Sequence, residues 1–78
     1  MQIWVLQVEV DSYIQTWVCN SRELARSYLA RYCREQWREE MGKKPIADED
    51  VVWEYFSFFT ERNWSESYIL NEETILES

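Results

Sequence analysis

Carboxylates are the side chains of this sequence most suited to binding metal ions or catalysing reactions, because several stand next to one another. The runs Glu39-Glu40, Asp48-Glu49-Asp50 and Glu72-Glu73 could supply oxygen ligands to Mg²⁺ or Ca²⁺. Adjacent residues of a helix or strand point in different directions, so each run offers at most one ligand per face. Two carboxylates could also act as general acid and base, but 78 residues leave little room for a cleft. We therefore expect no metal, no cofactor and no catalysis.

Other catalytic and cofactor motifs are missing from the sequence. Histidine, the commonest general base and metal ligand, does not occur. The only glycine, Gly42, cannot build a phosphate-binding loop, and Cys19 and Cys33 lack zinc-binding spacing. We expect both thiols to be reduced and buried as small apolar groups.

Arginines recur along residues 21–41 and raise the question of nucleic-acid binding. Glutamates interleave with them, as Glu35 follows Arg31 by four residues. Phosphate binding normally needs an uncompensated basic patch. We therefore expect a solvated, ion-paired helix face and no direct contact with nucleic acid. The arginines concerned are Arg22, Arg26, Arg31, Arg34 and Arg38.

The net charge of −7 is unevenly distributed. Residues 1–47 contain seven basic and six acidic side chains and are nearly neutral. Residues 48–78 contain nine acidic side chains against Arg62 alone. A field of one sign attracts basic partners and repels nucleic acid, although acids at a helix start and in a tail are also common solvated surface.

Aromatic residues coincide with this acidic segment. The chain contains five Trp, five Tyr and three Phe. The aromatics of a short helix at residues 49–59 point in three directions, and a 78-residue domain cannot bury all of them, so we expect Trp53 and Phe58 to be exposed. Exposed aromatics beside charge are typical of protein interfaces. The predicted partner-binding residues are Asp48, Glu49, Asp50, Trp53, Glu54, Phe58, Glu61, Glu66, Glu72 and Glu73.

Alternation and turn signals predict the elements that position these residues. Residues 2–10 and 13–19 have strand spacing and flank Asp11-Ser12, which predicts a β-hairpin. Asn20, with Glu23, is expected to cap a helix at residues 21–41 that ends before Gly42 and Pro45.

Asp48 is expected to cap the second helix, and residues 64–76 resume strand-like spacing. The order β-β-α-α-β predicts an α+β fold, a three-stranded, mostly antiparallel sheet with helices packed on one face. We expect residues 1–78 to form a single domain.

Four segments resemble small proteins of phages and prophages: MQIWVLQVEV, YCREQW, PIADED and SYILNEETIL. Some proteins of that type are anti-CRISPR inhibitors, which this chain is similar to in size and acidity. The resemblance implies an inhibitor that occupies the basic DNA-binding groove of a host defence complex, such as a CRISPR surveillance complex, with carboxylates in place of DNA phosphates. Because such inhibitors share no motif, it assigns no residue a role.

Two alternatives stay open at this point. The chain could be a structural or accessory phage protein, a homodimer or adaptor whose surplus aromatics pack against a second copy. It could also be a small enzyme or metal-binding regulator with converging carboxylates. The N-terminus lacks the regions of a secretion signal, and no apolar run approaches the roughly 20 residues of a membrane span. We expect no membrane partner and a cytoplasmic location, in the host cell if phage-encoded.

Overall fold

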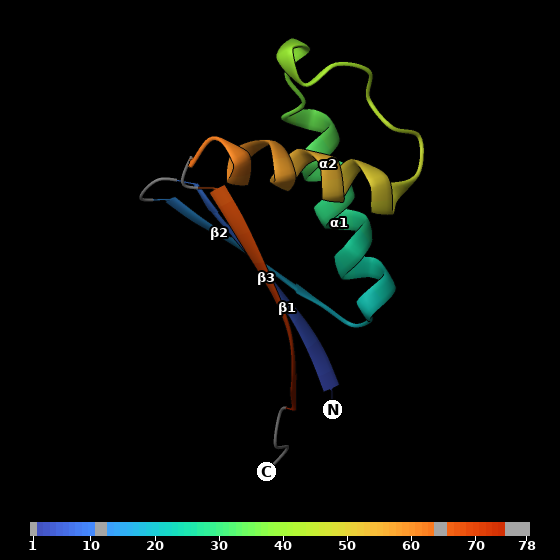
Figure 1. Ribbon diagram of the computed structural model, residues 1–78. Helices are drawn as coiled ribbons and strands as arrows, with labels where there is room; N and C mark the ends of the chain where they lie inside the picture. The colour runs from blue at the N-terminus through green and yellow to red at the C-terminus, as the bar shows by residue number, and fades with distance from the viewer. Residues whose placement is uncertain (1, 11–12, 64–65, 75–78) are drawn as a thin grey trace.

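The fold is a three-stranded sheet with two helices (Figure 1). The computed structural model describes residues 2–10, 13–63 and 66–74. Both strand pairings are antiparallel, in the spatial order β2-β1-β3, which confirms the predicted α+β class and element order. The elements are β1 (Gln2–Val10), β2 (Tyr13–Cys19), α1 (Arg22–Glu35), the 3-10 turn η1 (Glu39–Met41), α2 (Asp48–Glu61) and β3 (Glu66–Thr74).

One face of the sheet is covered by the helices and the other is open, and the side chains of the central strand β1 point alternately to each face. Leu6 and Val8 are buried and join the core formed with both helices. Leu6 stands opposite Trp17 of β2 and Leu70 of β3, which pack partly buried against the same core. Side chains alternate along a strand, so Gln7 and its neighbour Thr16 lie on the face away from the helices.

The first helix is shorter than predicted. Ser21, not Asn20, is its N-cap, and the Ser21 Oγ accepts a hydrogen bond from the Leu24 backbone N–H at 3.1 Å. The helix ends at Glu35, because the chain then turns so that Trp37 packs against the core. The Trp37 indole N–H donates to the Gly42 carbonyl at 2.9 Å, which fixes this turn.

The second helix begins one residue earlier than predicted and ends two residues later. Ala47 is the N-cap, and Asp48 is the first helical residue rather than the cap. The reason is that the Asp48 carboxylate pairs with the Arg34 guanidinium at 2.6 Å instead of capping the helix. Of the strand predicted over residues 64–76, residues 66–74 form β3, and the others lie outside the described residues, as does the predicted turn at residues 11–12.

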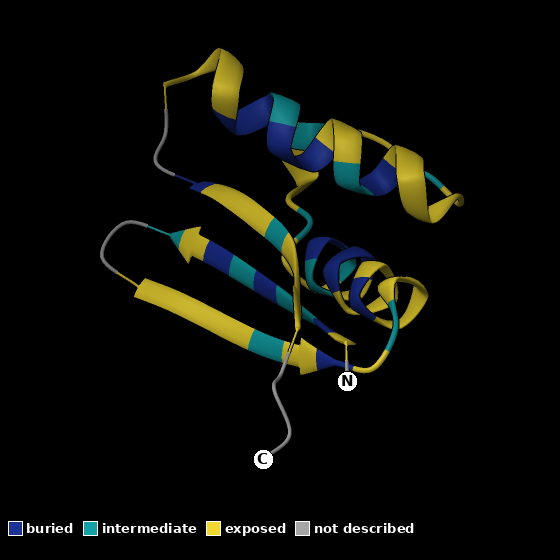
Figure 2. Ribbon diagram, turned by 90° about the horizontal axis from the view of Figure 1, so that it is seen from below, coloured by how far each residue is buried: buried dark blue, intermediate teal, exposed yellow. Residues whose placement is uncertain are grey.

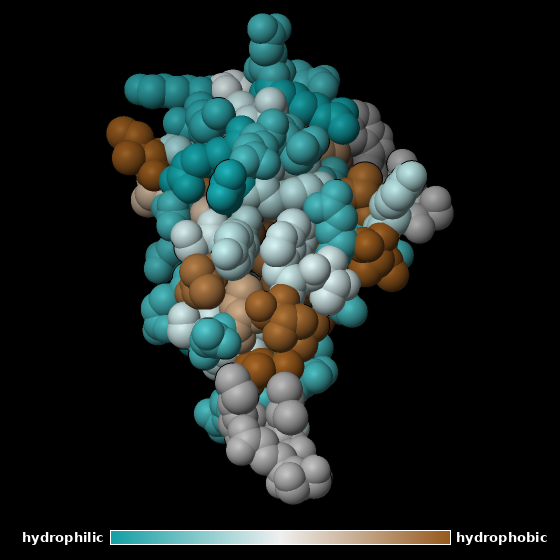
Figure 3. All heavy atoms as spheres, turned by 180° about the vertical axis from the view of Figure 1, so that it is seen from behind, coloured by the Kyte–Doolittle hydropathy of each residue, from teal (hydrophilic) through white to brown (hydrophobic). Residues whose placement is uncertain are grey.

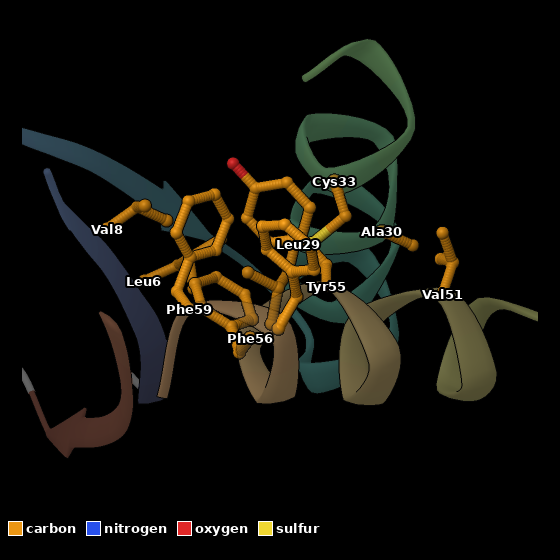
Figure 4. Close-up of a cluster of buried hydrophobic side chains, with 10 residues drawn as sticks. Leu6, Val8, Leu29, Ala30, Cys33, Val51, Tyr55, Phe56 and Phe59 are labelled. Atoms are coloured by element: carbon orange, nitrogen blue, oxygen red, sulfur yellow. The ribbon is translucent and has the colours of Figure 1, made fainter. Parts of the chain in front are cut away.

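The core lies where α1 and α2 meet the sheet (Figures 2 and 4). Ala25 and Ala30 are fully buried on α1, and such small side chains allow close approach of neighbouring elements. Four aromatic side chains of α2 are buried between α1 and the sheet. They are Tyr55, Phe56, Phe58 and Phe59. No helix in the described ranges is long and apolar enough to cross a membrane.

Replacing Leu6 with Ala tests this core. Leu6 is fully buried at the centre of the sheet, so the variant loses apolar contacts and leaves a cavity. We expect the free energy of unfolding to fall by about 2–5 kcal/mol in urea denaturation. The control, Ile46→Ala, removes an exposed side chain and should change it by less than about 0.5 kcal/mol. Equal losses in both variants would contradict the assigned core.

Candidate protein-binding groove

A buried carboxylate holds the three elements around the candidate site together. Glu66, the first residue of β3, is only 8% exposed. Its Oε1 accepts hydrogen bonds from the hydroxyls of Tyr32 in α1, at 2.8 Å, and of Tyr55 in α2. Hydrogen bonds to a charged acceptor are about twice as strong as neutral ones. We call these three side chains the Glu66 clamp.

Both tyrosines of the Glu66 clamp have raised pKa values. Burial, with the hydrogen bond to Glu66, raises the pKa of Tyr32 to about 12 and raises the pKa of Tyr55 as well. Burial, helped by the nearby Glu66 carboxylate, also raises the pKa of the Cys33 thiol to about 12. Cys19 and Cys33 are both buried and free, as the sequence predicts.

The clamp places the start of β3 beside α2. Two residues after Glu66, the Tyr68 ring lies 4.8 Å from the Phe56 ring, measured between centroids. Tyr68 and Leu70 share the covered face of β3 with Glu66, because side chains alternate along the strand. This arrangement forms the wall of a groove that we call the α2–β3 groove.

The α2–β3 groove consists of two adjoining hollows. The larger one, about 660 Å³, lies between α1, the first half of α2 and β3. The smaller one, about 430 Å³, follows the second half of α2. Both are lined by Val52, Trp53 and Tyr68, which therefore stand at their junction. Trp53 is 74% exposed, so a flat aromatic ring is presented to solvent at the middle of the groove.

Ion pairs neutralise part of the acidity at one end of the groove. Arg26 pairs with Glu49 at 3.4 Å, and Arg34 pairs with Asp48 at 2.6 Å. Both pairs join α1 to the start of α2, where the helix dipole also favours acidic residues. These two arginines of α1 thus hold α1 against α2, in agreement with the predicted ion-paired face.

Two acidic side chains of α2 lack the ion pairs that the residues at the start of the helix make. Within the described ranges, Asp50 and Glu54 have no ion-pair partner, and they lie one turn apart on the exposed side of the helix. Asp50 lines the larger hollow. Glu61 lines the smaller hollow. It forms a long, exposed ion pair with the Arg62 guanidinium, with 4.0 Å between the charged atoms. The groove therefore has carboxylates on both sides of Trp53.

The structure assembles part of the predicted partner-binding set. Asp48, Glu49, Asp50 and Trp53 line the larger hollow, and Glu61 lines the smaller one together with Trp53. Glu54 lies around the helix, in a third hollow beside Lys43 and Lys44. Glu72 and Glu73 lie further along β3, outside all three hollows and on opposite faces of the sheet.

Two of the predicted residues are buried. The expected exposure of Phe58 is wrong: its side chain is 8% exposed, because it packs in the core and the Arg62 guanidinium covers its ring at 3.6 Å. Arg38 similarly lies over the Phe59 ring. Glu66 was also expected on the surface, but its carboxylate points inward to the Glu66 clamp.

Several residues of the groove were not predicted from the sequence. Tyr68 and Leu70 line it from β3, and Arg22 and Arg26 line it from α1. The alternation of Glu66, Tyr68 and Leu70 could have placed them on one face of the strand. The pairing of this face with α2 is a tertiary contact that no sequence pattern indicates.

The described part of the chain contains no group of three or more Cys, Asp and Glu side chains that could hold a metal ion. Nothing in it indicates an enzyme. Comparison with protein-family models, curated proteins and solved structures found no match to the chain.

Removing the carboxylate of the clamp should destabilise the protein. In Glu66→Ala, the buried Tyr55 hydroxyl and the partly buried Tyr32 hydroxyl lose their acceptor, at a cost of about 1–3 kcal/mol for the buried one and less for the other. Urea denaturation should show this fall in the free energy of unfolding. Glu72→Ala, at an exposed site on the same face of β3, is the matched control and should lie within about 0.5 kcal/mol of the wild type. A similar small change for both would show that the clamp is dispensable.

Stability should also decline at alkaline pH. In the unfolded chain the Cys33 thiol and the Tyr32 hydroxyl lose their protons near their ordinary pKa values of 9.0 and 10.0, while the folded protein keeps them to about 12. The unfolded state thus binds fewer protons, and the free energy of unfolding falls as the pH rises from 9 to 12. Urea denaturation across this range measures the slope. Cys33→Ala should make the decline between pH 9 and 10 shallower; an unchanged slope would contradict the assignment.

Proposed function

We propose that the chain is a non-catalytic inhibitor that binds a protein with a basic surface through the α2–β3 groove. The observation that carries this proposal is the exposed Trp53 ring at the junction of two hollows with carboxylates on either side. Tryptophan is among the residues that contribute most to protein interfaces, since its large ring loses water-exposed area on binding.

The groove suits a protein segment better than a small molecule. Both hollows are open to solvent, and Val52, Phe56 and Tyr68 supply apolar surface around Trp53. An apolar side chain of the partner can fill this surface while its basic side chains approach Asp50 and Glu61. An apolar centre with a charged rim is the usual composition of such interfaces.

Charge favours a basic partner and disfavours nucleic acid. The net charge of −7 attracts basic proteins over distances set by the ionic strength. The surfaces that hold DNA are basic, so a nucleic-acid-binding protein is the partner class that this charge matches. The resemblance to phage proteins leads us to propose a host defence complex, such as a CRISPR surveillance complex, as the target. Blocking its DNA binding, with carboxylates in place of phosphates, is the proposed mechanism.

A DNA-competition assay tests this function. Purified CRISPR surveillance complexes of several types are mixed with labelled target DNA and increasing amounts of the protein. We expect at least one complex to lose DNA binding, with an inhibition that weakens as salt is raised. Failure to inhibit any complex of the panel would contradict the proposed target class.

Two variants of equal charge separate the groove from general acidity. Asp50→Lys with Glu61→Lys reverses two acids that line the groove, whereas Glu72→Lys with Glu73→Lys makes the same change of charge outside the groove. We expect the first pair, and Trp53→Ala, to weaken inhibition by about tenfold or more, typical of an interface anchor. The second pair should have a much smaller effect. Equal losses in both pairs would show that net charge alone is responsible.

A further inference from the structure

Strand β2 is an edge of the sheet without the usual protection. Its sequence, YIQTWVC, contains no charged residue, proline or glycine. Natural edge strands are normally protected by charges, proline or bulges, because their free backbone groups can pair with another strand. The other edge strand, β3, has such protection in Glu72 and Glu73. The two edges therefore differ in their capacity to pair.

The β2 edge is also open in three dimensions. Among the described residues, β2 pairs with β1 alone, and Figure 2 shows it as an outer, mostly exposed strand on the side of the sheet away from α2. Ile14 is 60% exposed and Val18 is 65% exposed. On the helix side, a hollow of about 340 Å³ lies between Trp17 of β2 and Tyr28 of α1. An added strand would thus find free space beside β2.

We propose that β2 pairs with β2 of a second copy of this chain, joining two three-stranded sheets into one continuous sheet. An antiparallel pairing about a two-fold axis at Thr16 places Ile14 opposite Val18 of the second copy, and Thr16 opposite its own equivalent. Each apolar pair would then cover side chains that are exposed in one copy. Cross-strand apolar pairs of this kind stabilise sheets.

The distribution of charge over the surface favours the β2 edge as the place where two copies associate. Two copies with a net charge of −7 repel one another, so they can meet only where the acids are absent. β2 itself has no charged residue. Arg31 and Glu35, which line the hollow beside it, neutralise each other at 3.0 Å, and Glu9, opposite Ile14, lies one strand further in, on β1. Pairing through β3 would instead bring Glu72 and Glu73 toward their equivalents. The proposed dimer leaves the α2–β3 groove of each copy free, so it is independent of the proposed function.

A charge-swap experiment tests the pairing. Sedimentation velocity of the full chain between about 1 and 200 µM should show the wild type changing from monomer to dimer. Thr16→Lys and Thr16→Glu each place like charges opposite one another at the two-fold axis, and each should weaken dimerisation at least about tenfold. An equimolar mixture of the two variants places opposite charges there and should restore the dimer. Circular dichroism verifies that both variants fold.

The control is Ile69→Lys, on the open face of β3, which should dimerise like the wild type. A wild type that stays monomeric over the whole range would overturn the proposal and leave the edge to a strand of another protein. A dimer that persists in both Thr16 variants, or that is lost in Ile69→Lys, would place the interface elsewhere. A mixture that fails to restore the dimer would overturn the register about Thr16.

Discussion

The buried carboxylate of Glu66 is the constraint around which this small fold is arranged. An ionisable group at 8% exposure is costly unless its charge is compensated by hydrogen bonds, and here Tyr32 and Tyr55 provide them. These three residues come from α1, α2 and β3. One oxygen atom therefore joins segments that lie 11 and 34 residues apart in the chain. The edge-on contact of the two tyrosine rings, with centroids 5.9 Å apart, adds to the same junction.

The position of α2 follows from this junction. With Tyr55 bonded to Glu66, Val51 and Phe59 also lie in the core beside it (Figure 4). Phe58 is buried as well, whereas Trp53 is exposed. Arginines then cover the edges of the aromatic core: Arg62 lies over Phe58 and Arg38 over Phe59. A short chain thus buries more aromatic surface than its elements alone can enclose, because long arginine side chains act as part of the cover.

Polar side chains cover much of one face of the molecule, although several large apolar side chains are exposed elsewhere on the surface. Figure 3 shows hydrophilic side chains over much of one face, with apolar ones in separate groups among them. Two places differ from this pattern. The α2–β3 groove combines Trp53 with acidic side chains, and the β2 edge combines exposed apolar side chains with an absence of charge. They lie at opposite edges of the sheet, so binding at one leaves the other accessible.

The sequence by itself determined the class of the fold and the bounds of the hairpin strands, because alternation and helical spacing are local properties of the chain. It also located the acidic segment and identified Trp53 as exposed. Only the tertiary structure decided that Glu66 and Phe58 are buried. The counts of charges and aromatics had predicted both on the surface. A carboxylate is stable in the interior only where donors from distant segments meet it, and an aromatic ring on α2 is buried only if a neighbour such as Arg62 covers it. These are contacts between elements, and a local pattern of residues does not encode them.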